Sequence, residues 1–155
     1  MSEAVIFSPF DGNSIPIEDV PDPVFAEKML GDGVAVNPSD GKVLAPLDGT
    51  ITILHSSGHA FTIQADNNSV TVLVHIGLDT VKLKGQGFTL HVKVGDKVKV
   101  GQPIITVDLK VVSEAGYSPI SPVILPDLHE QAQIEKYEMA KVVAGTSALF
   151  KVITP

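Results

Sequence analysis

The chain has 155 residues and a formal net charge of −7, and all 11 of its basic residues are lysines. The acidic balance and the lack of arginine argue against nucleic-acid binding, and the lack of cysteine excludes a disulfide framework or a thiolate metal site. Any phosphoryl group must be handled by imidazole, hydroxyl and backbone N–H groups, because arginine, the usual phosphate clamp, is missing.

The length suits one domain with its own core, so residues 1–155 are predicted to form a single domain. The 13 glycines and 11 prolines are spread along the chain and favour many short strands and turns. We therefore predict an all-β sandwich or barrel with one or two short helical turns. No run of about 18 apolar residues occurs, and residues 1–10 lack the regions of a signal peptide, so we expect a cytoplasmic location.

A Pro-x-Asp-Gly pattern occurs twice in the first third of the chain, in SPFDGNSIPI (8–17) and APLDGTITIL (45–54). Each copy reads as a turn that feeds a strand, which suggests two related halves of one sandwich. Between them a short helical turn is predicted from Asp22 to Gly31. Asp22 can cap it, Pro23 suits the first helical position and Gly31 can end it.

The later elements are read from valine spacing and turn residues. The stretch VKVGDKVKVGQPIITVD (92–108) has valines at alternate positions and Gly-Asp and Gly-Gln turns, which is typical of a hairpin. Residues 127–137 are ambiguous between a helical turn and a strand. SALFKVI (147–153) is predicted to be the closing strand.

A hairpin in the middle of the chain carries two histidines, His59 and His75. If its loop is Asp66-Asn67-Asn68, with Asn68 left-handed, Ala65 pairs with Ser69 and His59 lies directly opposite His75. Their Cβ atoms would then be roughly 5 Å apart on one face. A five-residue loop gives the same pairing, whereas a two- or four-residue loop would put the histidines on opposite faces.

The residues after His75 extend this prediction. In an extended strand, His75, Gly77 and Asp79 share one face, and Gly77 would leave a gap beside the imidazole. That gap could admit a phosphoryl group, a metal or a partner surface. The other histidines are interpreted as surface residues, with His55 at the rim of the site; they are His55, His91 and His129.

Two chemistries fit the pair of histidines, besides a purely structural role. In the first, one neutral imidazole accepts a phosphoryl group and its neighbour hydrogen-bonds the phosphoryl oxygens. Two close imidazoles disfavour charge on each other, which keeps the nucleophile neutral. In the second, His59, His75 and Asp79 bind zinc. Spacing alone does not decide between them.

Several motifs together resemble a known family: PDPVFAEKMLGDGVAVNP, APLDGTI, HAFTIQ, VLVHIGLDTVKLKGQGF and GDKVKVGQPIITVDL. They are similar to the glucose-type enzyme IIA of the bacterial sugar phosphotransferase system, from about Ser8 to Val152. The resemblance implies an antiparallel β-sandwich of duplicated hairpin motifs. It also implies a relay that accepts phosphate from the phosphocarrier protein HPr and passes it to a cysteine of a sugar permease's IIB domain, as a free protein or as part of the permease.

The resemblance also assigns roles by motif position. His75 matches the phosphorylated histidine, His59 the second active-site histidine that stabilises the phosphoryl group, and Ser57 the hydroxyl residue that orients His59. Acidic residues beside the site and an apolar docking face around it are matched by Asp22, Asp79, Phe25, Met29, Leu30, Leu73 and Val81. No cofactor or metal is implied.

Two departures and one cluster bear on partner binding. Ser69 stands where the family commonly has glycine, and His55 replaces an apolar residue at the rim. The segment that holds Val24, Phe25, Met29 and Leu30 is too short to bury them all, so it is predicted to be a docking patch; ordinary core packing is the alternative.

Two other classes of protein remain as alternatives. A lipoyl or biotinyl carrier domain has a hairpin similar to VKVGDKVKVGQPI, but neither Lys110 nor Lys141 has the Met-Lys-Met or Ala-Met-Lys context of a modified lysine. A zinc-dependent hydrolase could use His59, His75 and Asp79. Such enzymes usually add a His-x-His element, which the sequence lacks.

Overall fold

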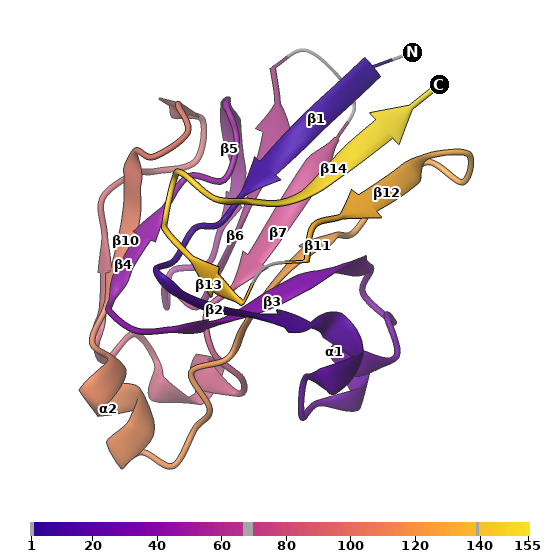
Figure 1. Ribbon diagram of the computed structural model, residues 1–155. Coiled ribbons are helices and arrows are strands. Elements are labelled where there is room, and N and C mark those ends of the chain that lie inside the picture. Colours follow the sequence, from indigo (N-terminus) through magenta and orange to yellow (C-terminus); the bar gives the residue numbers. More distant parts are fainter. Residues whose placement is uncertain (1, 67–69, 139) are drawn as a thin grey trace.

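The computed structural model describes residues 2–66, 70–138 and 140–155, which form antiparallel sheets joined by turns and short helices (Figure 1). One sheet has the order β13-β2-β3-β11-β7-β6-β5-β9. Its strands are β2 (Gly12–Pro16), β3 (Asp32–Pro38), β5 (Gly49–Leu54), β6 (Ala60–Ala65), β7 (Thr71–His75), β9 (Lys97–Val98), β11 (Ser121–Leu125) and β13 (Lys141–Val142).

Two smaller sheets lie against the large one. The first contains β1 (Ser2–Phe7), β14 (Ala148–Thr154) and β12 (Gln133–Lys136), and the second contains β4 (Lys42–Leu44), β10 (Pro103–Val107) and β8 (Phe88–Leu90). The helical elements are η1 (Ile17–Asp19), α1 (Pro23–Ala26), η2 (Thr80–Leu83) and α2 (Leu109–Glu114). The predicted all-β class with short helical turns is confirmed.

The two halves of the large sheet repeat each other, as the Pro-x-Asp-Gly patterns predicted. In one half β2 pairs with β3 and with β13, and in the other half β5 pairs with β6 and with β9. The short outer strands join at equivalent places, with the pairs Val142–Gly12, Lys141–Asn13, Val98–Gly49 and Lys97–Thr50. In each repeat, the strand that starts at the Asp-Gly turn therefore pairs through its own first two residues with a short Lys-Val strand.

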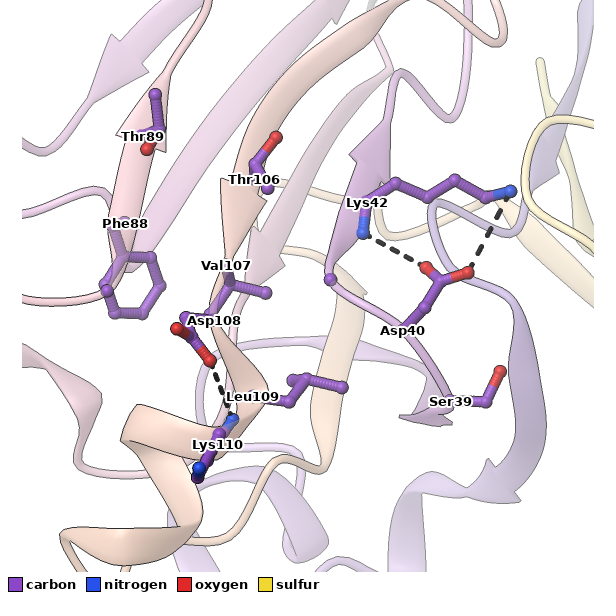
Figure 2. A pocket seen from close by; sticks show the side chains of 12 residues that line it. Ser39, Asp40, Lys42, Phe88, Thr89, Thr106, Val107, Asp108, Leu109 and Lys110 are labelled. Atoms are coloured by element: carbon purple, nitrogen blue, oxygen red, sulfur yellow. Dashed lines mark hydrogen bonds and ion pairs between the residues drawn. The ribbon is translucent and has the colours of Figure 1, made fainter.

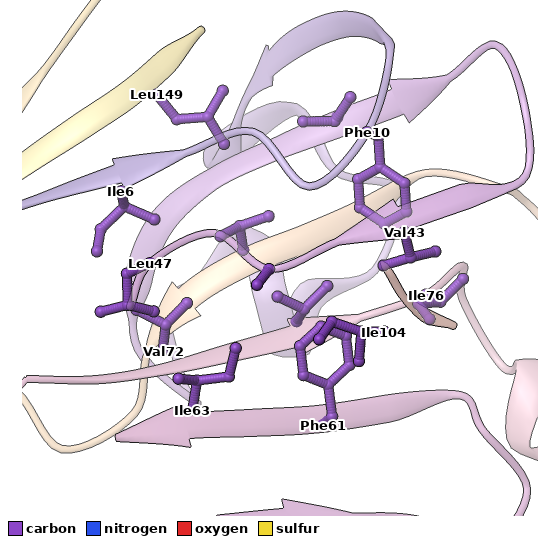
Figure 3. Close-up of a cluster of buried hydrophobic side chains, with 14 of the residues drawn as sticks. Ile6, Phe10, Val43, Leu47, Phe61, Ile63, Val72, Ile76, Ile104 and Leu149 are labelled. Carbon is purple, nitrogen blue, oxygen red and sulfur yellow. The ribbon is translucent and has the colours of Figure 1, made fainter. Parts of the chain in front are cut away.

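The core fills the space between the large sheet and the two smaller ones (Figure 3). Alternate residues of β6 and β7 point into it, including Phe61 and Ile63 on β6 and Val72 on β7, all fully buried. Full burial of each such side chain stabilises the fold by about 1.5–3 kcal/mol. The residues between them, including Thr62 and Leu73, consequently face outward, on the surface that carries His75.

A smaller apolar cluster covers part of this outer face. It contains Ile17, Val20, Phe25, Ala35, Leu78 and Ile124, with Leu73 packed against it. The predicted helical turn is confirmed as α1, which has Pro23 at its first position and Asp22 Oδ1 accepting from Val24 N–H at 3.0 Å. Regular α-helix ends at Ala26, and a turn at Glu27 and Lys28 is followed by bends at Met29 and Leu30.

Two other expectations have different outcomes. The hairpin predicted in residues 92–108 is wrong, because β9 pairs with β5 whereas β10 pairs with β4 and β8. Gly95 and Gly101 have φ values of 94° and 85°, and turns at these residues redirect the chain between sheets. The closing strand is confirmed as β14, and the ambiguous stretch before it contains turns and the strand β12.

Within the described residues, the helices are too short to cross a membrane.

Candidate active site

His75 is the last residue of β7 and lies on the outer face of the large sheet. Its cross-strand partner is Ala60, not His59 as predicted. Ala65 N–H donates to the carbonyl of Val70 at 2.9 Å, so the connection is one residue longer than expected. The predicted left-handed conformation of Asn68 and the predicted pairing of Ser69 lie outside the described residues.

The two imidazoles nevertheless come together, with ring centroids 5.4 Å apart and ring planes at 72°. His59 precedes β6 and lies in a bend, so the strict alternation of faces along a strand does not extend to it. Its carbonyl accepts from Ile76 N–H at 2.7 Å, which ties this bend to the end of β7. The prediction of a facing pair is wrong in register, whereas the two rings are neighbours.

Gly77 does not leave the gap predicted beside His75. The strand ends at His75, and Gly77 is buried in a turn with φ 72°. A Cβ there would lie 2.6 Å from Thr80 Cγ2 and 2.9 Å from the carbonyl oxygen of Ser118. The glycine is therefore required by the turn and by close packing, and it opens no pocket.

The turn fixes which nitrogen of His75 is available. His75 Nδ1 lies 2.6 Å from the carbonyl oxygen of Gly77, so Nδ1–H donates to it and the lone pair of the neutral ring is on Nε2. Gly77 N–H in turn donates to Ser121 Oγ at 3.0 Å. Ser121 comes from β11, and no local sequence signal indicated its role.

His59 is held in a comparable way by Ser57, whose Oγ lies 2.5 Å from His59 Nδ1. When this hydroxyl donates to Nδ1, the proton of the neutral ring is on Nε2. His59 is buried. Its ring also contacts the ring of the exposed His55, with centroids 4.7 Å apart and an angle of 34° between the ring planes. His55 was predicted to lie at the rim of the site, and its contact with His59 was not predicted.

Burial favours the neutral form of both imidazoles. Burial, with smaller contributions from His75 and His55, lowers the pKa of His59 to about 4. Burial also lowers the pKa of His75, against the opposing effects of the Gly77 hydrogen bond and of Asp22 and Asp79. His75 therefore presents a lone pair, and His59 can present an N–H.

The residues predicted to form the docking face differ in exposure. Met29 is 69% exposed, Val81 50% and Leu30 44%. Phe25, in contrast, is only 4% exposed, so the expectation that it lies on the surface is wrong. Its ring packs against that of His75 at 5.2 Å between centroids, which places it beneath the site. Leu73 is half-buried in the same outer cluster.

The other predicted residues frame His75 on two sides. Asp22 caps α1, and Asp79 is exposed in a left-handed conformation, with φ 61°, just before η2. Val81 lies in η2, and Val24 in α1 is 36% exposed. Two short helical segments, one on each side, thus bring exposed apolar side chains and a carboxylate to the neighbourhood of the histidine.

The alternative chemistries lack matching geometry. Among residues 2–66, 70–138 and 140–155, no group of three or more His, Cys, Asp or Glu side chains is arranged to hold a metal, so His59, His75 and Asp79 do not form the proposed zinc set. Lys110 lies in α2 and Lys141 begins β13. Neither lysine is at the tip of a hairpin, as a lipoyl or biotinyl attachment site requires.

A pocket of about 800 Å³ lies elsewhere, between β4, β8, β10 and the start of α2 (Figure 2). Several of its polar groups have structural partners. Asp108 caps α2 through Lys110 N–H, Asp40 bonds to Lys42, and Thr106 Oγ1 lies 2.7 Å from a ring nitrogen of His91. None of its lining residues is a candidate catalytic residue.

A β-sandwich with two neighbouring imidazoles, one of which directs Nε2 away from its hydrogen-bonded Nδ1 and lies next to exposed apolar side chains, has the arrangement expected of a histidine phosphocarrier domain. Residues 4–131 match the family model described as phosphoenolpyruvate-dependent sugar phosphotransferase system, EIIA 1. The chain belongs to this family and is an enzyme IIA component, a phosphoryl relay of the phosphotransferase system.

Individual relatives agree with this membership. The chain is 42% identical over 151 residues to the PTS system glucose-specific EIIA component of Oceanobacillus iheyensis, covering 97% of this chain and 91% of the relative. It is 44% identical over 147 residues to the protein of the same name from Halalkalibacterium halodurans, covering 95% and 84%. The solved structure of glucose permease IIA from Mycoplasma capricolum matches with a TM-score of 0.90 and 36% identity, covering 97% of this chain and 96% of that one.

Proposed function

We propose that residues 1–155 act as one phosphocarrier domain in which His75 accepts phosphate from HPr and passes it to the cysteine of a IIB domain. The observation that supports this proposal most strongly is the orientation of His75. Its Nδ1–H is engaged by the Gly77 carbonyl at 2.6 Å, which leaves Nε2 as the nucleophilic nitrogen.

The transfer proceeds by in-line attack. The lone pair of His75 Nε2 forms a bond to phosphorus while the bond between phosphorus and the donor's phosphohistidine nitrogen breaks, and that electron pair stays on the donor ring. In the second step the IIB thiolate sulfur attacks phosphorus, and the bond to Nε2 breaks. The high energy of the phosphohistidine bond drives the relay without ATP or a metal.

His59 and Ser57 act as the supporting pair. The Ser57 hydroxyl donates to His59 Nδ1, so His59 Nε2–H is free to donate to a phosphoryl oxygen. The lowered pKa of His59, about 4, keeps this ring neutral. The buried Phe25 ring beside His75 excludes water from one side, which limits hydrolysis.

Docking uses the apolar side chains exposed on either side of His75. Met29, Leu30 and Val81 contact both partners, because both must reach the same Nε2 atom. Leu73 and the buried Phe25 support this surface from beneath. The carboxylates of Asp22 and Asp79 meet basic groups of the partners at the rim.

The relatives' names support the sugar and the location. Two of them are glucose-specific EIIA components and the solved structure is a glucose permease IIA. We infer that this domain serves glucose or a closely related sugar. It works in the cytoplasm, either free or as a part of a membrane-bound permease.

Phosphate uptake tests the proposal. The protein is incubated with phosphoenolpyruvate, enzyme I and HPr, and its mass is measured before and after a IIB domain is added. One acid-labile phosphate is expected to appear and then to move to IIB. His75→Ala should abolish uptake, whereas His91→Ala, which changes an exposed histidine outside the site, should not. Undiminished labelling of the His75→Ala variant would contradict the assignment.

A further inference from the structure

His55 lies at the rim of the site, with its ring against that of His59. It follows the last residue of β5, and its side chain is exposed. Together with Leu73 it lines a groove of about 440 Å³ on the outer face of the large sheet. Nothing in the proposed transfer uses this side chain.

The backbone around His55 holds it in a defined place. Its N–H donates to the carbonyl of Ala60 at 3.1 Å, and its own carbonyl accepts from Gly58 N–H at 2.8 Å. This closes a tight turn that brings residue 55 next to residue 59. Gly58 has φ 77°, and a Cβ there would lie 2.8 Å from Phe88 Cβ, so the turn is fixed against β8.

The ring of His59 is consequently held by three different contacts. Ser57 Oγ lies 2.5 Å from Nδ1, the His75 ring meets it nearly perpendicularly at 5.4 Å, and the His55 ring packs against it at 4.7 Å and 34°. Offset packing of flat rings at such distances is attractive and restricts rotation. With the His55 ring over it, His59 is only 8% exposed although its neighbour is exposed.

We propose that His55 is a positioning residue for phosphoryl transfer, whose ring holds that of His59 in the orientation that presents Nε2–H beside His75. This inference rests on the proposed function, in which His59 donates to a phosphoryl oxygen. His55 acts in this role only through the packing of its flat ring against His59, so another flat side chain at position 55 should hold His59 equally well.

The first measurement does not depend on the relay. Nitrogen-15 NMR of the unphosphorylated protein reports which ring nitrogen of His59 carries the proton. Wild type should show a single Nε2–H tautomer. In His55→Ala the ring loses a packing surface, water reaches it, and the two tautomers should mix. In His55→Phe, which keeps a flat ring, the single tautomer should return.

The second measurement is the rate of phosphate transfer from phosphorylated HPr at saturating donor, in a single turnover. Loss of one such ring contact corresponds to a rate decrease of about two- to tenfold in His55→Ala. His55→Phe should restore the rate, and the matched control His91→Ala should leave it unchanged. The half-saturating donor concentration should move little, because positioning acts after the partner has bound.

The outcomes separate the two proposals. If wild type takes up no phosphate, the proposed function fails, and the His59 tautomer still decides whether His55 holds that ring. If His55→Ala keeps the wild-type tautomer and rate, the positioning role is wrong. It is equally wrong if His55→Ala changes only the half-saturating concentration, because His55 is then a partner contact.

Discussion

The neutral, buried state of His59 should make the protein less stable in mild acid. The pKa of His59 is lowered from 6.5 to about 4, so between these values the unfolded chain binds a proton that the folded protein does not. Stability is therefore fully present above pH 6.5 and is lost as the pH falls toward 4. At pH 4.5 the expected loss from this one group is about 2.5 kcal/mol, since each pKa unit is worth about 1.4 kcal/mol.

Urea unfolding between pH 4.5 and 7.5 measures this effect. His59→Gln cannot take up the proton, so its free energy of unfolding should fall about 2.5 kcal/mol less over this range than that of wild type. His91→Gln, which changes an exposed ring, provides the control. The lowered pKa values of Asp11 and Asp32 act below pH 4 and do not interfere. An identical pH dependence in wild type and His59→Gln would refute the reasoning.

Three other changes test the site. His59→Ala should slow transfer to a IIB domain by about 10²–10³-fold in quench-flow measurements, because one donor to the transition-state oxygens is lost; a wild-type rate would exclude this role. Met29→Asp, at a 69% exposed position, should melt like wild type and weaken HPr binding in calorimetry by roughly 2–4 kcal/mol. Phe25→Asp, in contrast, should unfold the buried cluster. Unchanged HPr affinity of a folded Met29→Asp variant would place the docking face elsewhere. Gly77→Ala should lower the free energy of unfolding by about 1–3 kcal/mol, through its left-handed backbone and the contact with Ser118; unchanged stability in urea would disprove that strain.

Local chemistry predicted several elements correctly because the residues that decide them are adjacent in sequence. Asp22 and Pro23 start α1, and the repeated Asp-Gly turns start β2 and β5. In each case a cap or turn depends on one or two residues and their own backbone. Element type can therefore be read from such a stretch without knowledge of its neighbours in space.

The errors concern geometry that depends on distant parts of the chain. The alternation of side chains along a strand predicted that His59 faces His75 across a hairpin and that Gly77 extends the strand. In the structure His59 lies in a bend before β6 and Gly77 in a bend after β7. Ser118 and Ser121, more than 40 residues further on, accept bonds that hold the Gly77 turn. Contacts of this kind have no periodic signature, so the sequence could indicate the two histidines without indicating how they meet.

The same reasoning explains the docking residues. The sequence showed that the segment with Val24, Phe25, Met29 and Leu30 could not bury every apolar side chain, which is correct for three of them. It could not show which one turns inward. That choice depends on Ala35 and Ile124, which line the outer face of the large sheet and receive the Phe25 ring.

The identity of the phosphorylated atom tests the account most directly. Phosphorus-31 and nitrogen-15 NMR of the protein phosphorylated by HPr would show which ring nitrogen is bonded to phosphorus. The geometry of His75, with Nδ1–H donating to the Gly77 carbonyl at 2.6 Å, predicts a bond at His75 Nε2 and a proton retained on Nδ1. Phosphate on His75 Nδ1, or on the ring of His59 or His55, would contradict the account.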